Sequence, residues 1–150
     1  MGNAIGIDFG LRKCIAAFKS VNIEVVIDEF GKSFLPSIVA WENGEIVVGD
    51  RAYRQLEYDP ENVIASIGRI MGRGFSDPIV QQQALHLSYK IKPPSQGTDD
   101  SLVVILGGKE YEPEEIAAEI FKQVVKNTKD YLMRQVKFIE VPEITEAVSY

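Results

Sequence analysis

The sequence predicts an α+β fold, with short strands first and helices later along the chain. Apolar segments of strand length, separated by Gly- and Asn-containing turns, fill its first part. Apolar side chains then recur at helical spacing over residues 113–132. With 150 residues, 45% hydrophobic and 25% charged, the chain has the size and composition of one globular domain.

Composition also excludes several classes of function. A formal net charge of −6 argues against non-specific binding to nucleic acid, which requires a basic face. No apolar run approaches the length that spans a membrane, and no secretory leader pattern opens the chain. Cys14 is the only cysteine and His86 the only histidine, which excludes an internal disulfide and a zinc site of the usual kind. We therefore expect a reducing, cytoplasmic location, with no nucleic-acid or membrane partner.

Several strands are predicted before any helix. The first of them form a meander, because turn-forming residues separate them closely. The next form a hairpin, since Asn43-Gly44 is a strong signal for a tight turn between strands. In chain order, the predicted strands lie at residues 4–8, 14–18, 24–27, 36–41 and 46–48.

Short helices and a further hairpin are predicted in the middle of the chain. Asp50 is a suitable N-cap for a helix at 51–57. A second helix is predicted at 63–71, ending at Gly72. A hairpin follows whose first strand lies at 102–106 and whose turn contains consecutive glycines.

The clearest helix is predicted at 113–132. Pro113 suits its first position, and the two glutamates that follow complement the positive end of the helix dipole. Its apolar stripe predicts packing on a sheet. Strands are predicted after it, at 136–141 and 145–150. Because the chain ends within that last apolar run, we expect it to be a truncated piece of a longer protein.

The candidate site lies at the first turn. A short apolar strand carries Asp8 to Gly10, which is how nucleotide-binding hairpins present a carboxylate and backbone amides to phosphate and magnesium. Such hairpins continue with small hydroxyl residues, whereas this one continues with Leu11, Arg12 and Lys13. In one interpretation Arg12 and Lys13 supply phosphate-binding charge; in the other they are exposed charges of a shortened hairpin.

A series of short motifs runs in order along the whole chain. They are Ala4-Ile5-Gly6-Ile7-Asp8-Phe9-Gly10, Pro36-Ser37-Ile38-Val39-Ala40, Val48-Gly49-Asp50-Arg51-Ala52, Asp59-Pro60-Glu61-Asn62-Val63, the arginine-rich stretch at 69–77, and residues 108–116. Taken together, they resemble the first part of the ATPase domain of the seventy-kilodalton heat-shock chaperones. Sugar kinases and actins share the opening hairpin but not the Arg-Ile-Met-Gly-Arg landmark.

This resemblance implies an actin-like, ribonuclease-H-like ATPase fold of two lobes, with ATP or ADP and Mg²⁺ between them. Residues 1–150 would supply only the first sheet of lobe I and the small subdomain above it. Residues 1–35 and 113–150 would belong to the core lobe, and residues 36–112 to the small subdomain. The nucleotide-binding positions implied are Asp8, Gly10, Leu11, Arg12, Lys13 and Arg69, with Asp8 holding magnesium through water.

Three departures from the family pattern affect the implied chemistry. The family's Gly-Thr-Thr-x-Ser-Cys becomes Gly10-Leu11-Arg12-Lys13-Cys14, one residue shorter and without either threonine. The family's catalytic lysine is replaced by Gly68, which offers no charge to the γ-phosphate. Residues 137–144 resemble an insertion. We therefore predict no catalytic residue in this chain, weak nucleotide binding and no ATP hydrolysis by the chain alone.

Some residues keep two interpretations. Asp8 either holds magnesium or bonds to neighbouring turn amides. Arg69 either borders the adenine side of the cleft or forms a solvated pair with Arg73 at a helix end. His86 is interpreted as a structural loop residue, because no second ligand accompanies it. Trp41 is expected to cover the sheet of the small subdomain.

Two functions follow from the resemblance. In the first, the chain is the N-terminal part of an ATP-binding chaperone of the stress response, which folds polypeptides together with co-chaperones. In the second, it is a divergent, non-hydrolysing interaction module. The close match along the chain favours the first, whereas Gly68 and the missing threonines favour the second. An exposed apolar sheet face also predicts dimer formation.

Overall fold

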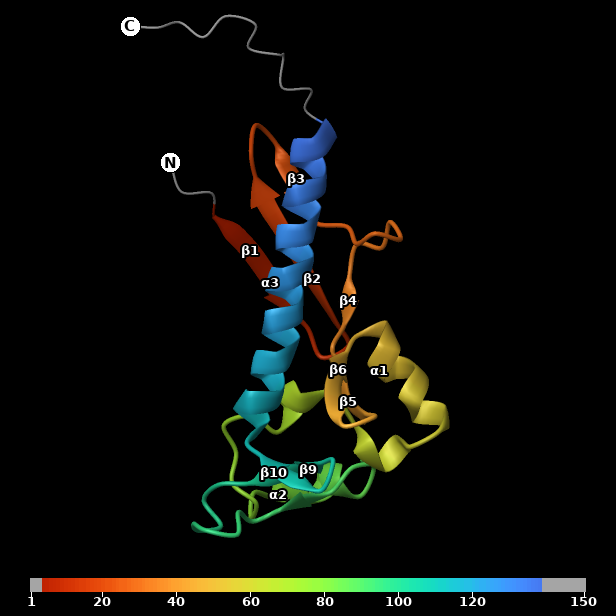
Figure 1. Cartoon of the computed structure of the whole chain (residues 1–150). Helices are drawn as coiled ribbons and strands as arrows, with labels where there is room; N and C mark the ends of the chain where they lie inside the picture. Colours follow the sequence, from red (N-terminus) through yellow and green to blue (C-terminus); the bar gives the residue numbers. More distant parts are fainter. Residues whose placement is uncertain (1–3, 139–150) are drawn as a thin grey trace, which may run out of the picture.

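The computed structural model describes residues 4–138, which form antiparallel sheets and one long helix, α3 (Pro113–Phe138), that runs along them (Figure 1). The upper part of Figure 1 contains the first sheet and most of α3, and the lower part contains two smaller sheets. The start of the first strand and the end of α3 lie at the same end of the molecule. These observations confirm a mixed fold in which strands precede the long helix.

The first sheet packs one of its faces against α3. Its central strand alternates strictly, with Cys14, Ala16 and Phe18 buried on the helix side. The rings of Phe18 and Tyr131 lie 5.8 Å apart between centroids, which joins the sheet to the helix. The strands are β1 (Ile5–Phe9), β2 (Lys13–Lys19) and β3 (Ile23–Val25) in that order, with β4 (Leu35–Pro36) also beside β2.

Two three-stranded sheets make up the lower part. The hairpin predicted through Asn43-Gly44 is confirmed, and both turn residues have the positive φ that such turns require, 51° and 87°. The second sheet consists of β6 (Glu45–Val48), β5 (Ile38–Glu42) and β7 (Val63–Ala65), with α1 (Asp50–Arg54) packed on it. The third consists of β10 (Lys109–Tyr111), β9 (Val103–Leu106) and β8 (Ile91–Lys92), and α2 (Pro78–Ala84) also lies in the lower part.

Helix α3 holds the parts together through its apolar stripe. Ile116 and Ile120 are completely buried in the main core. Phe121 stacks on Phe9 of β1, with ring centroids 4.7 Å apart. The helix predicted at 113–132 is therefore confirmed, and it continues to Phe138.

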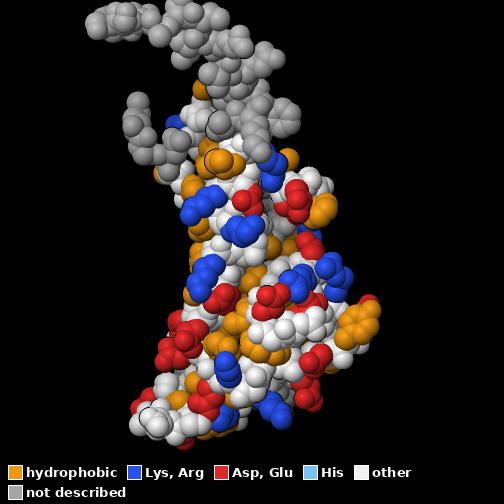
Figure 2. Space-filling model, in the orientation of Figure 1, with side chains coloured by type: hydrophobic (Ala, Val, Ile, Leu, Met, Phe, Trp, Pro, Cys, Tyr) orange, Lys and Arg blue, Asp and Glu red, His pale blue; other side chains and the backbone are white. Residues whose placement is uncertain are grey.

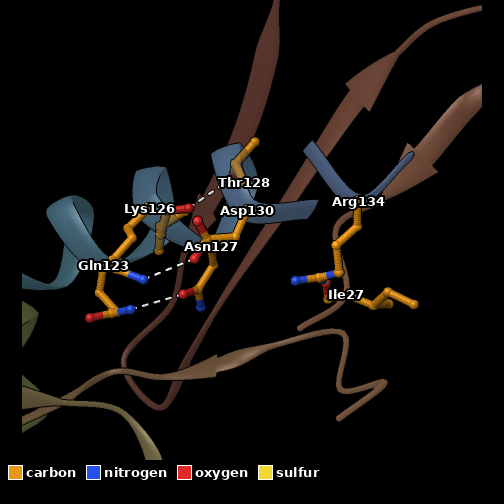
Figure 3. Close-up of polar contacts among 8 residues, drawn as sticks. Ile27, Gln123, Lys126, Asn127, Thr128, Asp130 and Arg134 are labelled. Atoms are coloured by element: carbon orange, nitrogen blue, oxygen red, sulfur yellow. Dashed lines mark hydrogen bonds and ion pairs between the residues drawn. The ribbon is translucent and has the colours of Figure 1, made fainter. Parts of the chain in front are cut away.

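Polar side chains of α3 bond to one another and to the end of the first sheet (Figure 3). Gln123 Nε2 donates a hydrogen bond of 2.8 Å to Asn127 Oδ1, and Lys126 forms an ion pair of 2.9 Å with Asp130. Arg134 Nη2 donates to the carbonyl oxygen of Ile27 over 2.7 Å. This last bond fixes the chain where it leaves the first sheet.

The helix predicted at 63–71 is wrong. Residues 63–65 form β7 and pair with β5, because two of the three are β-branched and bury both faces of the strand. Ser66 then adopts a left-handed conformation with φ 55°, which ends the strand. Only one turn of 3₁₀ helix follows, η3 (Ile67–Arg69).

Two further expectations need correction. Asp50 is the first residue of α1 and makes no capping bond; Gly49 takes the cap position, and Asp50 pairs with Lys32 instead. The strand predicted at 136–141 is wrong as far as Phe138, because α3 continues through it. The rest of that strand, the predicted strand at 145–150 and the rest of the insertion at 137–144 lie outside the described residues.

The sheet face away from α3 is open and carries both apolar and charged side chains. Ile23 and Val25 are 76% and 44% exposed there, and the register places Val25 opposite Ala17 and Ile23 opposite Lys19. On the side that carries α3, Lys and Arg side chains are mixed with Asp and Glu (Figure 2). Within residues 4–138, no helix combines the length and the apolar character that crossing a membrane requires.

Candidate functional site

The first turn connects β1 to β2 and contains most of the predicted phosphate-binding residues. Gly10 N donates to Lys13 O over 3.0 Å, which closes a tight turn around Leu11 and Arg12. A Cβ on Gly10 would lie 2.6 Å from Lys13 O, so only glycine fits there. The N–H groups of Leu11 and Arg12 make no hydrogen bond within the described part of the chain. The turn therefore still presents bare backbone amides.

The turn is held in place by the segment that enters the second sheet. Ser37 N donates to Arg12 O over 2.9 Å. Cys14 Sγ lies 3.2 Å from Ser37 Oγ, and both side chains are buried. Burial raises the pKa of the Cys14 thiol, so the thiol remains protonated near neutral pH. These contacts make Cys14 a structural residue that positions the turn.

The opposite wall of the site begins at Ser66. Its left-handed backbone directs the chain into η3, so that Gly68 faces the first turn. A Cβ on Gly68 would lie 3.0 Å from Leu11 Cδ2, tighter than nine in ten real Cβ contacts. Leu11 therefore lies against the position at which the family resemblance places a catalytic lysine.

A cleft of about 530 Å³ opens beside this contact, bounded by the first turn, the segment before β5 and helix α1. Its volume is in the range of small-ligand sites, about 300–1,000 Å³. Most of its wall is apolar or aromatic. The apolar and aromatic lining residues are Leu11, Phe34, Pro36, Ile38, Tyr53, Leu56 and Ala65.

Charged groups at the cleft differ in how they are compensated. Lys32 pairs with Asp50, and its Nζ lies 4.4 Å from the centroid of the Phe34 ring. Arg12 also lines the cleft, and no carboxylate of residues 4–138 lies within ion-pair distance of its guanidinium. The cleft thus has a positive charge that the described carboxylates do not neutralise.

The predicted site residues are only partly brought together. Leu11 and Arg12 line the cleft, and Gly10 shapes the turn that carries them. Lys13 does not line the cleft; its Nζ lies 5.5 Å from the centroid of the Phe34 ring. Asp8 is exposed and also lies outside the cleft lining. Part of the turn that was expected to bind phosphate therefore lines the cleft, whereas the carboxylate of Asp8 does not.

Arg69 is placed at the end of η3 and is exposed, outside the cleft lining. Arg69 and Arg73 were expected to be two solvated side chains at a helix end. Arg73 instead forms an ion pair, in which its Nη1 lies 2.9 Å from Asp77 Oδ2. That contact and the Asp77 cap on α2 lower the pKa of the Asp77 carboxyl, chiefly through the amide of Ile79. Arg73 and Asp77 thus stabilise the start of α2.

Several residues of the cleft were missed by sequence reasoning. Lys32 and Phe34 stand just before the Pro36-Ser37 motif, and that position was the signal that could have found them. Tyr53 reaches the cleft from the exposed side of α1, as helical spacing from the buried Ala52 would allow. Ser66 carries no signal, because its left-handed conformation is unusual for serine.

The residues present do not fit a magnesium triphosphate in the manner that the resemblance implies. Leu11 supplies no hydroxyl donor, and Gly68 supplies no ammonium group. Within residues 4–138, no group of three or more His, Cys, Asp or Glu side chains is arranged to hold a metal ion. The turn amides and Arg12 remain as donors at the first turn, and Ser66 also lines the cleft.

Known proteins match the chain along most of its length. A family model described as Hsp70 protein matches residues 4–143. The chaperone protein DnaK of Psychrobacter cryohalolentis is 38% identical over 133 residues. That match covers 88% of this chain and 20% of the relative, so the chain spans about a fifth of the relative's length.

Proposed function

The chain belongs to the Hsp70 family of heat-shock chaperones, and we propose that it is the N-terminal part of an ATP-binding molecular chaperone that cannot by itself hydrolyse ATP. Family membership implies an actin-like ATPase fold, and the mixed sheets and helix of residues 4–138 are consistent with one portion of it. The proposal concerns what this portion retains of the family's chemistry.

The observation that supports the loss of hydrolysis is the place of Leu11, whose Cδ2 lies 3.0 Å from where a Cβ on Gly68 would stand. Phosphoryl transfer depends almost entirely on positioned donors and cations around the γ-phosphate. At this corner an aliphatic side chain faces a residue without a side chain. The remaining turn amides support weak binding of nucleotide, with Asp8 as the candidate for holding magnesium through water.

We assign residues 1–35 and 113–150 to a core lobe and residues 36–112 to a small subdomain. Support for this division comes from the sheets: β1 to β4 form one sheet, whereas β5 to β10 form two others. Through a longer protein, such a portion would act with co-chaperones on unfolded polypeptides in the cytoplasm. Dimer formation through the open sheet face is part of the same proposal.

A second candidate function is a non-hydrolysing interaction module. One observation favours it: α1 and the 3₁₀ turn after it, η1 (Gln55–Glu57), lead into exposed aromatic residues. Tyr53 is 61% exposed and Tyr58 78% exposed. Tyrosine is enriched at protein interfaces because it offers a large apolar ring and a polar end. Such a surface would bind a partner without any nucleotide chemistry.

Calorimetric titration with ATP and ADP, in the presence of MgCl₂, tests the proposed function. We expect binding weaker than micromolar and no release of phosphate in a parallel turnover assay. Asp8→Ala is the matched variant, because it removes the candidate magnesium carboxylate from an exposed position. Micromolar binding that is lost in Asp8→Ala would contradict the proposal, since Arg12 and Lys13 would then have rebuilt a functional phosphate site.

A further inference from the structure

The wall of the cleft beside the first turn suits an apolar ligand. Leu11 contributes to it from the turn, and Tyr53 and Leu56 contribute from α1 and η1. Because Leu11 also contacts the Gly68 position, the corner next to the turn is closed by aliphatic atoms. A volume of about 530 Å³ is enough for a small organic molecule.

The charge of the same cleft suits a single negative group. Lys32 is neutralised by Asp50, whereas Arg12 has no carboxylate partner among residues 4–138. The amides of Leu11 and Arg12 make no hydrogen bond within that range and lie at the same turn. A guanidinium beside bare amides binds a carboxylate or sulfonate through charge-assisted hydrogen bonds.

We propose that this cleft binds a small apolar molecule that carries one negative group, such as an aromatic carboxylate or sulfonate. Arg12 and the turn amides bind the negative group, and the apolar wall around Leu11 and Tyr53 holds the body of the molecule. Such binding rests on the proposed function, because it requires that the turn holds a magnesium triphosphate only weakly.

A monoanion is favoured over a nucleotide by the cost of desolvation. A triphosphate carries several negative charges, and each must exchange water for a donor or a cation on entering the cleft. Arg12 is the cleft's uncompensated cation within the described residues, and Leu11 gives no donor in place of a hydroxyl. One negative group can be satisfied under these conditions, whereas several cannot.

Fluorescence titration with 8-anilinonaphthalene-1-sulfonate tests the proposal, since the probe joins an aromatic body to one sulfonate. We expect one saturable site whose affinity falls roughly tenfold or more in Arg12→Gln, as expected for a charged hydrogen bond. N-phenyl-1-naphthylamine, which has the same body without the sulfonate, should bind more weakly and should not respond to Arg12→Gln. Arg12 is exposed in a turn, so this variant should fold.

Two control variants distinguish probe binding in the cleft from probe binding elsewhere on the surface. Arg54→Gln removes an exposed basic side chain that does not line the cleft and should leave the affinity unchanged. Ile23→Ser changes the open sheet face, and it too should preserve the component that depends on Arg12. Probe binding that is insensitive to Arg12→Gln, or that is abolished by Ile23→Ser, would overturn the proposal.

Nucleotide competition distinguishes this proposal from the function on which it rests. If magnesium ATP binds with micromolar affinity, the weak nucleotide binding that the proposed function includes is wrong, whatever the probe does. If neither magnesium ATP nor the probe binds at the cleft, only the monoanion proposal fails. Binding of the probe that millimolar magnesium ATP does not displace supports both.

Discussion

Leu11 Cδ2 lies 3.0 Å from the position that a Cβ atom on Gly68 would occupy. The two residues are 57 positions apart in the sequence, and the family resemblance implies phosphate-binding residues at both positions. Their contact makes the two departures a single structural feature. A side chain at position 68 would require Leu11 to move by a few tenths of an ångström, whereas glycine leaves room for the leucine.

A double-mutant cycle on this contact gives the first prediction. Gly68 is exposed and has no positive φ, so Gly68→Ala should by itself stabilise the fold by about 0.5–1 kcal/mol through the unfolded state. Because the added Cβ meets Leu11, we expect little or no gain in the natural sequence. In a Leu11→Ala background the gain should appear, giving a coupling free energy of about 0.5–1 kcal/mol in urea denaturation. Strict additivity would contradict the contact.

Local pattern was sufficient to predict the outer architecture. Turn-forming residues between short apolar runs identified β1 and β2, Asn43-Gly44 identified the hairpin, and the apolar stripe identified α3. These signals are local, because each arises within one turn or one element. The family resemblance supplied the rest of the fold class.

The failures have a tertiary cause. Residues 63–65 join the second sheet because β5 offers a partner edge, and no neighbouring residue reveals that partner. Asp50 was expected as a cap, but Lys32 competes for its carboxylate from another segment. The cleft was missed in part for the same reason: Phe34, Tyr53 and Leu11 meet only after the turn and α1 have docked.

A pair of substitutions in α3 compares how much a buried apolar side chain and a buried hydroxyl contribute to the free energy of unfolding. Ile120 is completely buried, so Ile120→Ala should lower the free energy of unfolding by about 2–5 kcal/mol. Thr128 is buried to a similar extent, and its hydroxyl donates to Val124 O over 2.8 Å (Figure 3). Because a helix amide also serves that carbonyl, Thr128→Val should change stability by less than about 1 kcal/mol. Chemical denaturation measures both, and equal losses would contradict this view.

Glu110 gives a prediction about pH. Hydrogen bonds from Lys92 and Ser95 lower the pKa of its carboxyl from 4.5 to about 2. A lowered pKa in the folded state means that the associated stability is present above pH 4.5 and is lost as the pH falls toward 2. NMR titration of the Glu110 carboxyl should show this shift, and Lys92→Gln should return the pKa toward its ordinary value. A titration near 4.5 in the unmodified chain would contradict the contacts.

The open face of the first sheet gives a prediction about assembly. Ile23 and Val25 are exposed on that face, and a sheet with one helix-covered face normally buries the other against a second layer. We therefore expect a concentration-dependent dimer in analytical ultracentrifugation. Val25→Lys should shift the chain toward monomer, because it places a charge opposite Ala17 in the apolar part of that face.

Val125→Lys is the matched control for this assembly. Val125 is 40% exposed and Val25 44% exposed, so the two substitutions add the same charge to similar surroundings. Val125 belongs to α3, which covers the opposite face of the sheet, so its replacement should leave the dimer intact. If the unmodified chain stays monomeric at high concentration, the open face does not drive self-association. If both variants dissociate the dimer equally, the interface is not confined to that face.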